Sequence, residues 1–247
     1  MKQFITILAA GLLVFGASAT YAQTSLVGHF HKVKVSPYIQ VSLVQGDRES
    51  VTIDQLTVDS SKLHVEVHGG TLHLYLDGAK IFPHDKTYKG HGDRISQALY
   101  PNHAVIVTVV YKKLDGLSLR GEETYVCRSP LRADHFTLHI YGESTVNFTE
   151  VHFAKMHTSI YGESALNINA GEVSQQHYTC FGEGKINTTA IAGREAWVTA
   201  FGDAEFRMNV SDRIRIAAFG DARLRYMGNP DIVKGIHAGE MDLQRLD

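Results

Sequence analysis

The chain has 247 residues, and its 24 Lys and Arg nearly balance its 26 Asp and Glu. This balance does not indicate the concentrated basic face that nucleic acid requires, so no nucleic-acid partner is predicted. Nor does it indicate an anionic membrane surface as the partner. The chain has only two cysteines, and it is long enough to bury a core without disulfides.

The first 22 residues have the pattern of a secretory signal peptide. Lys2 precedes an almost wholly apolar run from Phe4 to Phe15, and small residues follow up to Ala22. A retained membrane anchor is the alternative, but the run is shorter than the roughly 20 residues that span a bilayer. We expect cleavage after Ala22 and no later membrane span. The protein would then be exported to the periplasm or to the cell surface.

Residues 23–118 read as an N-terminal β-strand region. Apolar and polar residues alternate with period two, and β-branched residues are frequent, which favours strands over helices. Gly69 and Gly70 separate two alternating runs and predict a hairpin. Prolines and glycines interrupt residues 82–103, for which we predict a loop. The predicted strands lie at 29–35, 39–44, 50–54, 63–67, 72–76 and 105–110.

From residue 119 onward a glycine followed by an acidic residue recurs about every 20 residues. A fixed period of this length with strand-like alternation is typical of a solenoid, whose coils stack on one another and share a core. We therefore predict an all-β protein in which residues 119–247 form a parallel β-solenoid. The repeated pairs are Gly121-Glu122, Gly142-Glu143, Gly162-Glu163, Gly182-Glu183, Gly202-Asp203 and Gly220-Asp221.

An aromatic residue precedes each of the last five glycines. Residues two, four and six positions before the glycine, such as Ile140, Leu138 and Phe136, should point inward, so the aromatic residue should point outward. Exposed rings could stack on sugar rings or receive a partner's strand. The alternative is a structural role, as a packing surface under the N-terminal strands or as a corner stack. Trp197 lies on the same outward side and can report on this surface. The predicted ligand-binding row consists of Tyr141, Tyr161, Phe181, Phe201 and Phe219.

The acidic residues after the glycines should also form a row. Charges on successive coils about 4.8 Å apart repel by about 1 kcal/mol in water, and more if desolvated. We therefore expect a solvated corner; calcium bridging successive carboxylates is the weaker alternative. The row consists of Glu122, Glu143, Glu163, Glu183, Asp203 and Asp221.

Cys127 and Cys180 are expected as free, buried thiols. They lie about three coils apart, about 14 Å at the strand spacing, which exceeds the roughly 7 Å that a disulfide spans. No cofactor is predicted.

Two further candidates for chemistry give weak signals. His84, Asp85, His91 and Asp93 fall in the predicted loop, but their spacing matches no zinc motif, so no metal site is predicted there. No nucleophile elbow or phosphate loop occurs, and we predict that the protein is not an enzyme. A carbohydrate-active enzyme is the remaining alternative, with Glu143 or Glu163 beside a basic residue as the place to look.

Several segments together resemble a known family. His29–Ser36, Ile39–Asp47 and Ser50–Ile53 are similar to the start of the head GIN domain of the putative auto-transporter adhesins, also a domain of unknown function. Leu114–Gly121 resembles its second half, and Gly228–Pro230 its end. The resemblance covers residues 29–246 and implies an exported protein of Gram-negative bacteria folded as stacked β-coils. It brings no catalytic or binding residues, and this chain carries glutamate where small residues or aspartate are common after the glycine.

These observations favour a non-catalytic, adhesin-like binding module. It would present its outer rows to a glycan, or to a protein of the envelope or a host surface. The alternative is a structural envelope spacer whose ends assemble, and the sequence leaves the oligomeric state open. Residues 231–247 carry several charges and could form a polar cap of the kind that solenoid ends need.

Overall fold

The computed structural model describes the backbone of residues 23–81, 86–90 and 93–247, and the side chains of residues 23–81 and 98–247. The predicted signal peptide, residues 1–22, lies outside the described residues. So do His84, Asp85 and His91 of the weak metal candidate, and the side chain of Asp93.

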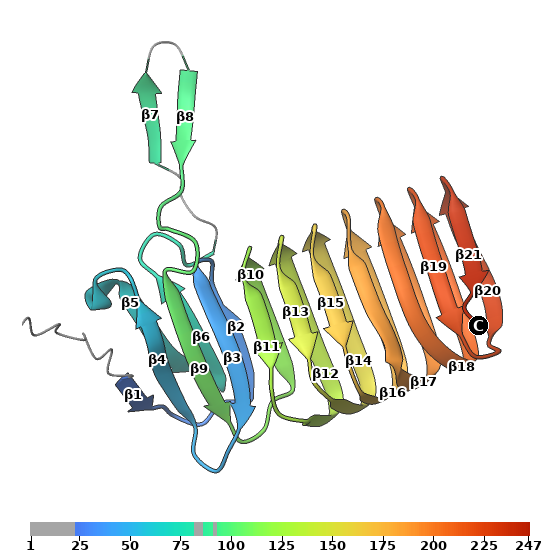
Figure 1. The fold of residues 1–247 in the computed structure, drawn as a ribbon, viewed down its shortest axis with the longest axis horizontal. Coiled ribbons are helices and arrows are strands. Elements are labelled where there is room, and N and C mark those ends of the chain that lie inside the picture. Colours follow the sequence, from blue (N-terminus) through green and yellow to red (C-terminus); the bar gives the residue numbers. More distant parts are fainter. Residues whose placement is uncertain (1–22, 82–85, 91–92) are drawn as a thin grey trace, which may run out of the picture.

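The described part is nearly all β, as predicted. The N-terminal region contains a short 3-10 helix, η1 (Ser60–Lys62), and one pair of strands that the sequence did not predict. These strands, β7 (Lys86–Gly90) and β8 (Asp93–Gln97), pair antiparallel and project from the body (Figure 1). The sequence suggested a loop there because of its glycines, but glycines are equally compatible with a hairpin. The other strands are β1 (Gln23–Leu26), β2 (Lys32–Val35), β3 (Ile39–Gln45), β4 (Ser50–Leu56), β5 (Leu63–His68), β6 (Thr71–Leu76) and β9 (Val105–Tyr111).

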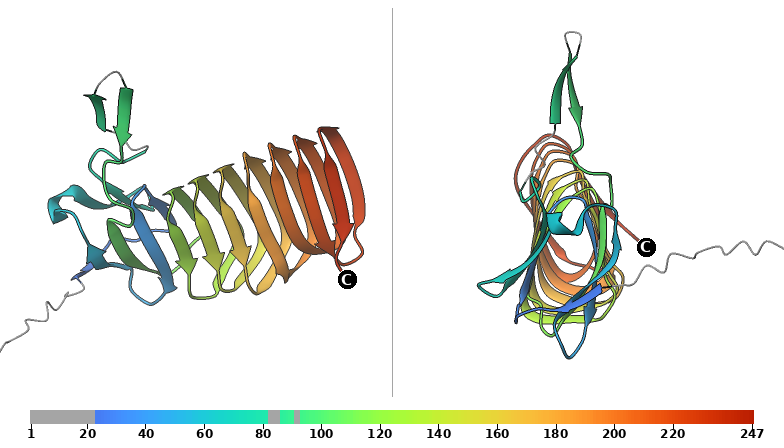
Figure 2. Two further views of the ribbon diagram at one scale, coloured as in Figure 1. Left: turned by 45° about the horizontal axis from the view of Figure 1, so that its top comes forward. Right: turned by 90° about the vertical axis from the view of Figure 1, so that its left-hand side faces the viewer.

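The predicted parallel β-solenoid is confirmed, with about six turns of roughly 20 residues. Figure 1 shows these coils side by side along the long axis, and the end-on view in Figure 2 shows that they share one column. Their strands are β10 (Gly116–Gly121), β11 (Thr124–Cys127), β12 (Leu131–Gly142), β13 (Thr145–Phe148), β14 (Val151–Gly162), β15 (Ala165–Ile168), β16 (Gly171–Phe181), β17 (Lys185–Phe201), β18 (Ala204–Phe219), β19 (Ala222–Met227), β20 (Asp231–Ala238) and β21 (Met241–Arg245).

The strands form two parallel columns that continue into the N-terminal region. One column runs β6, β2, β10, β12, β14, β16, the second half of β17, the second half of β18, and β20. We call its outer side the long-strand face. The other column runs β9, β3, β11, β13, β15, the first halves of β17 and β18, β19 and β21, and its outer side is the short-strand face.

Alternation builds the core between the two columns. Phe136, Leu138 and Ile140 are fully buried, as their parity predicted, and each such side chain contributes about 1.5–3 kcal/mol when removed from water. The corner between the columns requires glycine, because Gly162 has φ +114° and a Cβ there would lie 2.4 Å from the carbonyl oxygen of Gly142.

The two ends of the stack differ. At the N-terminal end, antiparallel pairs β1–β4, β4–β9 and β5–β6 flank the parallel columns. At the C-terminal end, β20 and β21 each pair on one side only within the described residues. Lys234 and His237 occupy positions of β20 in register with buried Ile216 and Ala218, and a register shift separates them. These charged or polar groups at inward positions agree with the predicted polar cap.

Candidate functional site

The predicted aromatic row is a continuous stack on the long-strand face. Neighbouring ring centroids lie 4.8–5.3 Å apart, with ring planes within 5° of parallel. The parallel register of β12, β14, β16, β17 and β18 places one ring on each coil. Tyr161, Phe181, Phe201 and Phe219 remain 37–42% exposed. The rings therefore do not pack under the N-terminal strands. We call Tyr141, Tyr161, Phe181, Phe201 and Phe219 the aromatic ladder.

The faces of these rings are occupied by one another. A centroid spacing near 5 Å leaves no room for a sugar ring between two of them. At one end the guanidinium carbon of Arg120 lies 4.3 Å from the Tyr141 centroid, and at the other Phe219 is in register with Ala238. A partner therefore meets mainly ring edges, which carry the positive end of the ring quadrupole. The expected platform for stacked sugars is not available along most of the ladder.

A second row of rings runs parallel to the ladder. His157 stacks on His177 with centroids 4.4 Å apart, and His177 stacks on Trp197 at 4.3 Å. Arg215 and Val233 continue this row in register. The sequence prediction used Trp197 only as a reporter and missed the row, although its first three members are also spaced by 20 residues.

A row of small polar residues separates the two rows of rings. Ser159, Thr179, Thr199 and Ala217 are in register on successive strands, and each is partly buried. Each lies two residues from a ladder ring along its strand and two from the other row, so the rows of rings stand about 13 Å apart. Hydroxyl groups thus line the floor between two walls of rings.

The floor opens into a hollow near the C-terminal end of the face. It has a volume of about 230 Å³ and lies between Trp197, Arg215 and Val233 on one side and Thr199 and Ala217 below. We call the strip of small residues between the two rows, Ser159, Thr179, Thr199 and Ala217, the trough of the long-strand face.

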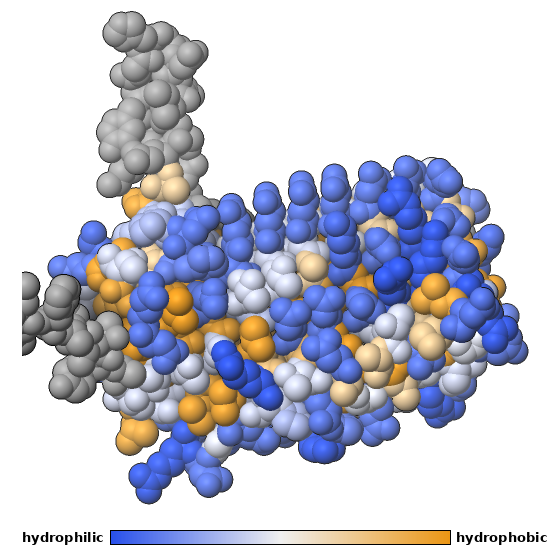
Figure 3. Space-filling view, in the orientation of Figure 1, coloured by the Kyte–Doolittle hydropathy of each residue, from blue (hydrophilic) through white to orange (hydrophobic). Residues whose placement is uncertain are grey.

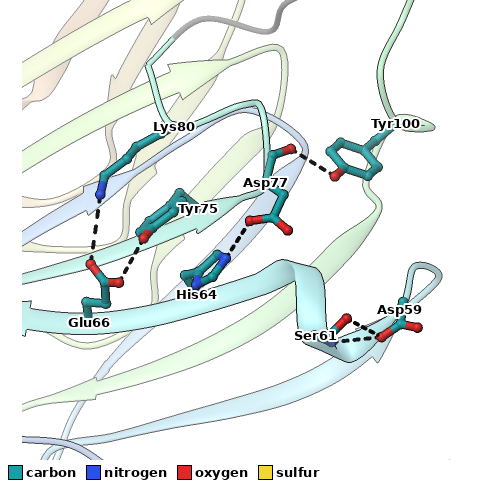
Figure 4. Close-up of polar contacts among 8 residues, drawn as sticks. All are labelled: Asp59, Ser61, His64, Glu66, Tyr75, Asp77, Lys80 and Tyr100. Carbon is teal, nitrogen blue, oxygen red and sulfur yellow. Dashed lines mark hydrogen bonds and ion pairs between the residues drawn. The ribbon is translucent and has the colours of Figure 1, made fainter.

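Interlocked polar contacts close the N-terminal end of this face (Figure 4). Tyr75 donates a hydrogen bond to Glu66 at 2.8 Å, and the Lys80 ammonium lies 4.2 Å from the Tyr75 ring centroid and 4.0 Å from the Glu66 carboxylate. The His64 ring stacks on Tyr75, and its Nε2 lies 2.6 Å from the Asp77 carboxylate. The hydrogen bond from Tyr75, followed by the nearby Lys80, lowers the pKa of Glu66. The carboxylates at this end thus already have partners.

Burial and neighbouring cations shift the pKa values of several groups on the long-strand face. Burial and then the charges of Arg120 and Lys80 lower the pKa of Lys34. Burial, followed by Lys34 and Lys80, lowers the pKa of His73 to about 4. Farther along, burial, His157 and Lys155 lower the pKa of His177 to about 4. His73 and His177 are thus neutral at pH 7 and lie near lysine side chains.

The predicted acidic row lies at the corner beyond the ladder, and all six members are exposed. Figure 3 shows a regular row of hydrophilic side chains along the upper edge of the stack. The backbone N–H of Glu163 donates to the carbonyl of Gly142 at 3.0 Å, and Glu143 bonds Gly121 in the same way. Over residues 23–81 and 98–247, no three His, Cys, Asp or Glu groups converge as metal ligands would. The six carboxylates at this corner are therefore open to solvent.

The other residues singled out by the sequence do not form a reactive site. Cys127 and Cys180 are buried free thiols, and burial raises the pKa of Cys180 to about 12. Among the side chains described, Glu143 and Glu163 have no basic group within ion-pair distance.

A larger hollow of about 770 Å³ lies where the long strands bend, away from the ladder. Of the charged groups that line it, His152 lies 3.5 Å from Glu172, and Arg194 bonds Asp212 at 3.1 Å. Its lining offers neither stacked rings nor a net charge that selects a partner.

The fold and its surface can now be compared with known proteins. The sequence model of the family described as putative auto-transporter adhesin, head GIN domain, matches residues 29–230. The chain belongs to this family. No curated protein matches it.

Solved structures share the fold of this GIN-domain protein. One is a putative adhesin from Bacteroides fragilis, with a TM-score of 0.74, 17% identity, and coverage of 91% of this chain and 96% of the other. A putative adhesin from Parabacteroides distasonis has a TM-score of 0.64, 18% identity and coverage of 91% and 96%. A structure from the same species described as a putative lipid binding protein has a TM-score of 0.65, 18% identity and coverage of 92% and 96%. At these identities the comparison establishes the architecture only.

Membership in this family suggests an exported or surface protein and an adhesin-like role, and the family and two of these structural neighbours are named as putative adhesins, not as enzymes. In the described residues we find no helix with the length and hydrophobicity to cross a bilayer.

Proposed function

We propose that this GIN-domain protein is an exported, non-catalytic, adhesin-like module that binds an extended partner chain along the long-strand face. The observation that carries the proposal is the trough between the aromatic ladder and the second row of rings, with hydroxyl groups on its floor. Its rings and hydroxyls recur on the three successive strands β14, β16 and β17 and so suit a ligand with repeating units.

A glycan fits this trough better than a peptide. The floor offers hydroxyls at about 4.8 Å intervals, which can exchange hydrogen bonds with sugar hydroxyls. A peptide that adds a strand needs a free sheet edge, and a helix needs an apolar groove. Neither lies on this face, whose strands are paired on both sides from β2 to β18.

Trp197 provides the test, because it is the chain's only tryptophan and stands on the wall of the trough. Purified protein is screened on immobilised glycans and envelope proteins, and each hit is titrated while Trp197 emission is recorded. Phe181→Ser with Phe201→Ser should weaken a true hit at least about tenfold, roughly 1.4 kcal/mol. The matched control, Lys185→Ser with Arg223→Ser on the short-strand face, should not.

A hit that leaves Trp197 emission unchanged and tolerates the ladder substitutions would place binding elsewhere and refute the proposal. A protein that changes Trp197 emission and loses affinity for the ladder variant would show that the long-strand face binds a polypeptide and not a glycan. Circular dichroism of both double variants establishes that each remains folded.

The alternative of a spacer that assembles through its ends has one feature in its favour, the unpaired outer edges of β20 and β21 in the described residues. However, Lys234 points toward the core side of that edge, and inward charges and bulges are devices by which proteins prevent edge-to-edge pairing. Light scattering that shows a monomer at high concentration is the expected result.

A further inference from the structure

The long-strand face carries a charge opposite to that of the chain as a whole. The chain has a formal net charge of −2, yet between β2 and β20 cations outnumber carboxylates at the outward positions that lie between the aromatic ladder and Lys155 with its register partners. The cations there are Lys32, Lys34, Arg120, Lys155, Arg213 and Arg215, and the carboxylates are Glu195 and Asp231. Nearer the bend of the long strands, outward Arg132 and Glu172 add one charge of each sign.

Most of this positive charge is not neutralised within the face. Asp231 lies 3.7 Å from Arg213 and accounts for one of the two carboxylates. In the part of the chain with described side chains, Lys34, Lys155 and Arg215 have no carboxylate within ion-pair distance. The cations are also spread along the axis, from β2 to β18, rather than gathered at one point.

The short-strand face has fewer free cations. Arg207 lies 3.3 Å from Glu205, and Arg225 bonds Asp242 at 2.6 Å. In the described residues Lys185 and Arg223 are cations of its coils without an ion pair, so they serve as the matched control. The acidic row lies at the corner.

The neutral groups on the long-strand face have the same polarity as its cations. The exposed edges of the aromatic ladder carry the positive end of the ring quadrupole, because the ring faces are turned toward one another. The imidazole rings of His73 and His177 can donate an N–H, and Ser159, Thr179 and Thr199 can donate an O–H. A negatively charged chain in the trough would meet donors and cations along its whole length.

We infer that the ligand of this face is a linear acidic polysaccharide, bearing carboxylate or sulfate groups, that lies along the axis of the stack. This inference rests on the proposed function and deepens it. The hydroxyl floor binds the sugar, and the cations at both ends of the trough bind its anionic groups.

The probes are dextran sulfate, polygalacturonate and uncharged dextran, each immobilised and tested with the purified protein at 50 and 300 mM NaCl. Dextran sulfate, polygalacturonate or both should bind at low salt and shift Trp197 emission, whereas dextran should not bind. Binding should weaken at high salt because exposed charge pairs are screened. The stronger of the two polyanions identifies sulfate or carboxylate as the preferred group.

Two double variants with the same change in net charge test whether polyanion binding depends on where the lost cations lie. Lys155→Gln with Arg215→Gln removes two cations from the long-strand face, and Lys185→Gln with Arg223→Gln removes two from the short-strand face. All four residues are at least partly exposed, so both variants should fold. The first should weaken binding about tenfold, which corresponds to about 0.7 kcal/mol per lost ion pair, and the second less than about twofold.

Equal losses in both variants would show attraction by net charge alone and overturn the inference. Failure of both polyanions to bind would do the same. A neutral glycan whose binding depends on Phe181 and Phe201 but not on Lys155 and Arg215 would also overturn it while leaving the proposed function intact. Tighter binding to polyglutamate than to polygalacturonate, with the same dependence on Lys155 and Arg215, would assign the face to an acidic polypeptide instead.

Discussion

Replacing a ring in the middle of the aromatic ladder should cost more stability than replacing the ring at its end. Phe181 stacks on Tyr161 at 5.0 Å and on Phe201 at 4.8 Å, whereas Phe219 stacks on Phe201 alone, at 5.3 Å. Each aromatic pair is worth about 0.5–1.5 kcal/mol beyond the area it buries. Because leucine retains most of that burial, Phe181→Leu should lower the free energy of unfolding by about 1–3 kcal/mol, and Phe219→Leu by about half as much.

Equilibrium unfolding in urea, followed by Trp197 fluorescence and by circular dichroism, measures both changes. The two phenylalanines are 38% and 42% exposed, so a difference in burial cannot produce a twofold difference in cost. Equal costs would show that stacking does not stabilise the ladder. Costs below about 0.5 kcal/mol at both positions, the range of ordinary surface substitutions, would show that the rings are a solvated surface with no structural role.

Three further substitutions or conditions test other parts of the structure. Gly162→Ala should destabilise the fold by more than about 3 kcal/mol, because it combines a disallowed backbone conformation with a Cβ 2.4 Å from a carbonyl oxygen; soluble, cooperatively unfolding protein with near-normal stability would contradict this. The pKa values of His73 and His177 are about 4 in the folded protein against an ordinary 6.5, so the unfolded chain binds protons first as the pH falls. Stability should be full above pH 6.5 and decline toward pH 4 by on the order of 1 kcal/mol per histidine after allowance for solvent screening; urea unfolding at pH 7.5 and 5 measures it, and His73→Gln with His177→Gln should flatten the difference. The buried thiol of Cys180, its pKa raised to about 12, should not react with a disulfide reagent until the protein is unfolded, and rapid labelling of native protein would contradict its burial.

The sequence predicted the coils well because their signals repeat. Period-two alternation predicted which residues point inward, and the recurring glycine predicted the register, so the burial of Ile140 and the outward position of Phe181 both followed. Parity alone could not show that the rings would stack face to face. That arrangement depends on the side-chain torsions and on the 4.8–5.3 Å spacing, and it changes which ligands the ladder can hold.

Other features have no repeat to reveal them. Glu122 and Glu123 are adjacent residues of the same type, but their surroundings differ. Glu122 is exposed, whereas Glu123 is only 3% exposed and accepts a hydrogen bond from the backbone N–H of Tyr38. Burial raises the pKa of Glu123. The stacking of β2 and β3 onto the first coils was likewise hidden, because those strands lack the glycine–acid pair that marks the later coils.

The structure also explains why a side of this stack, rather than its end, should meet a partner. A solenoid that ends in an unmodified strand would pair with any other open edge and grow. Here Lys234 and His237 occupy the positions that Ile216 and Ala218 fill on the preceding coil, and the register shift beside Gly235 interrupts the ladder of backbone hydrogen bonds. A further coil would have to bury the Lys234 charge without a partner, which costs more than the added apolar contacts return. Growth is thereby discouraged at the end, while the repeating side surface remains open to a long ligand.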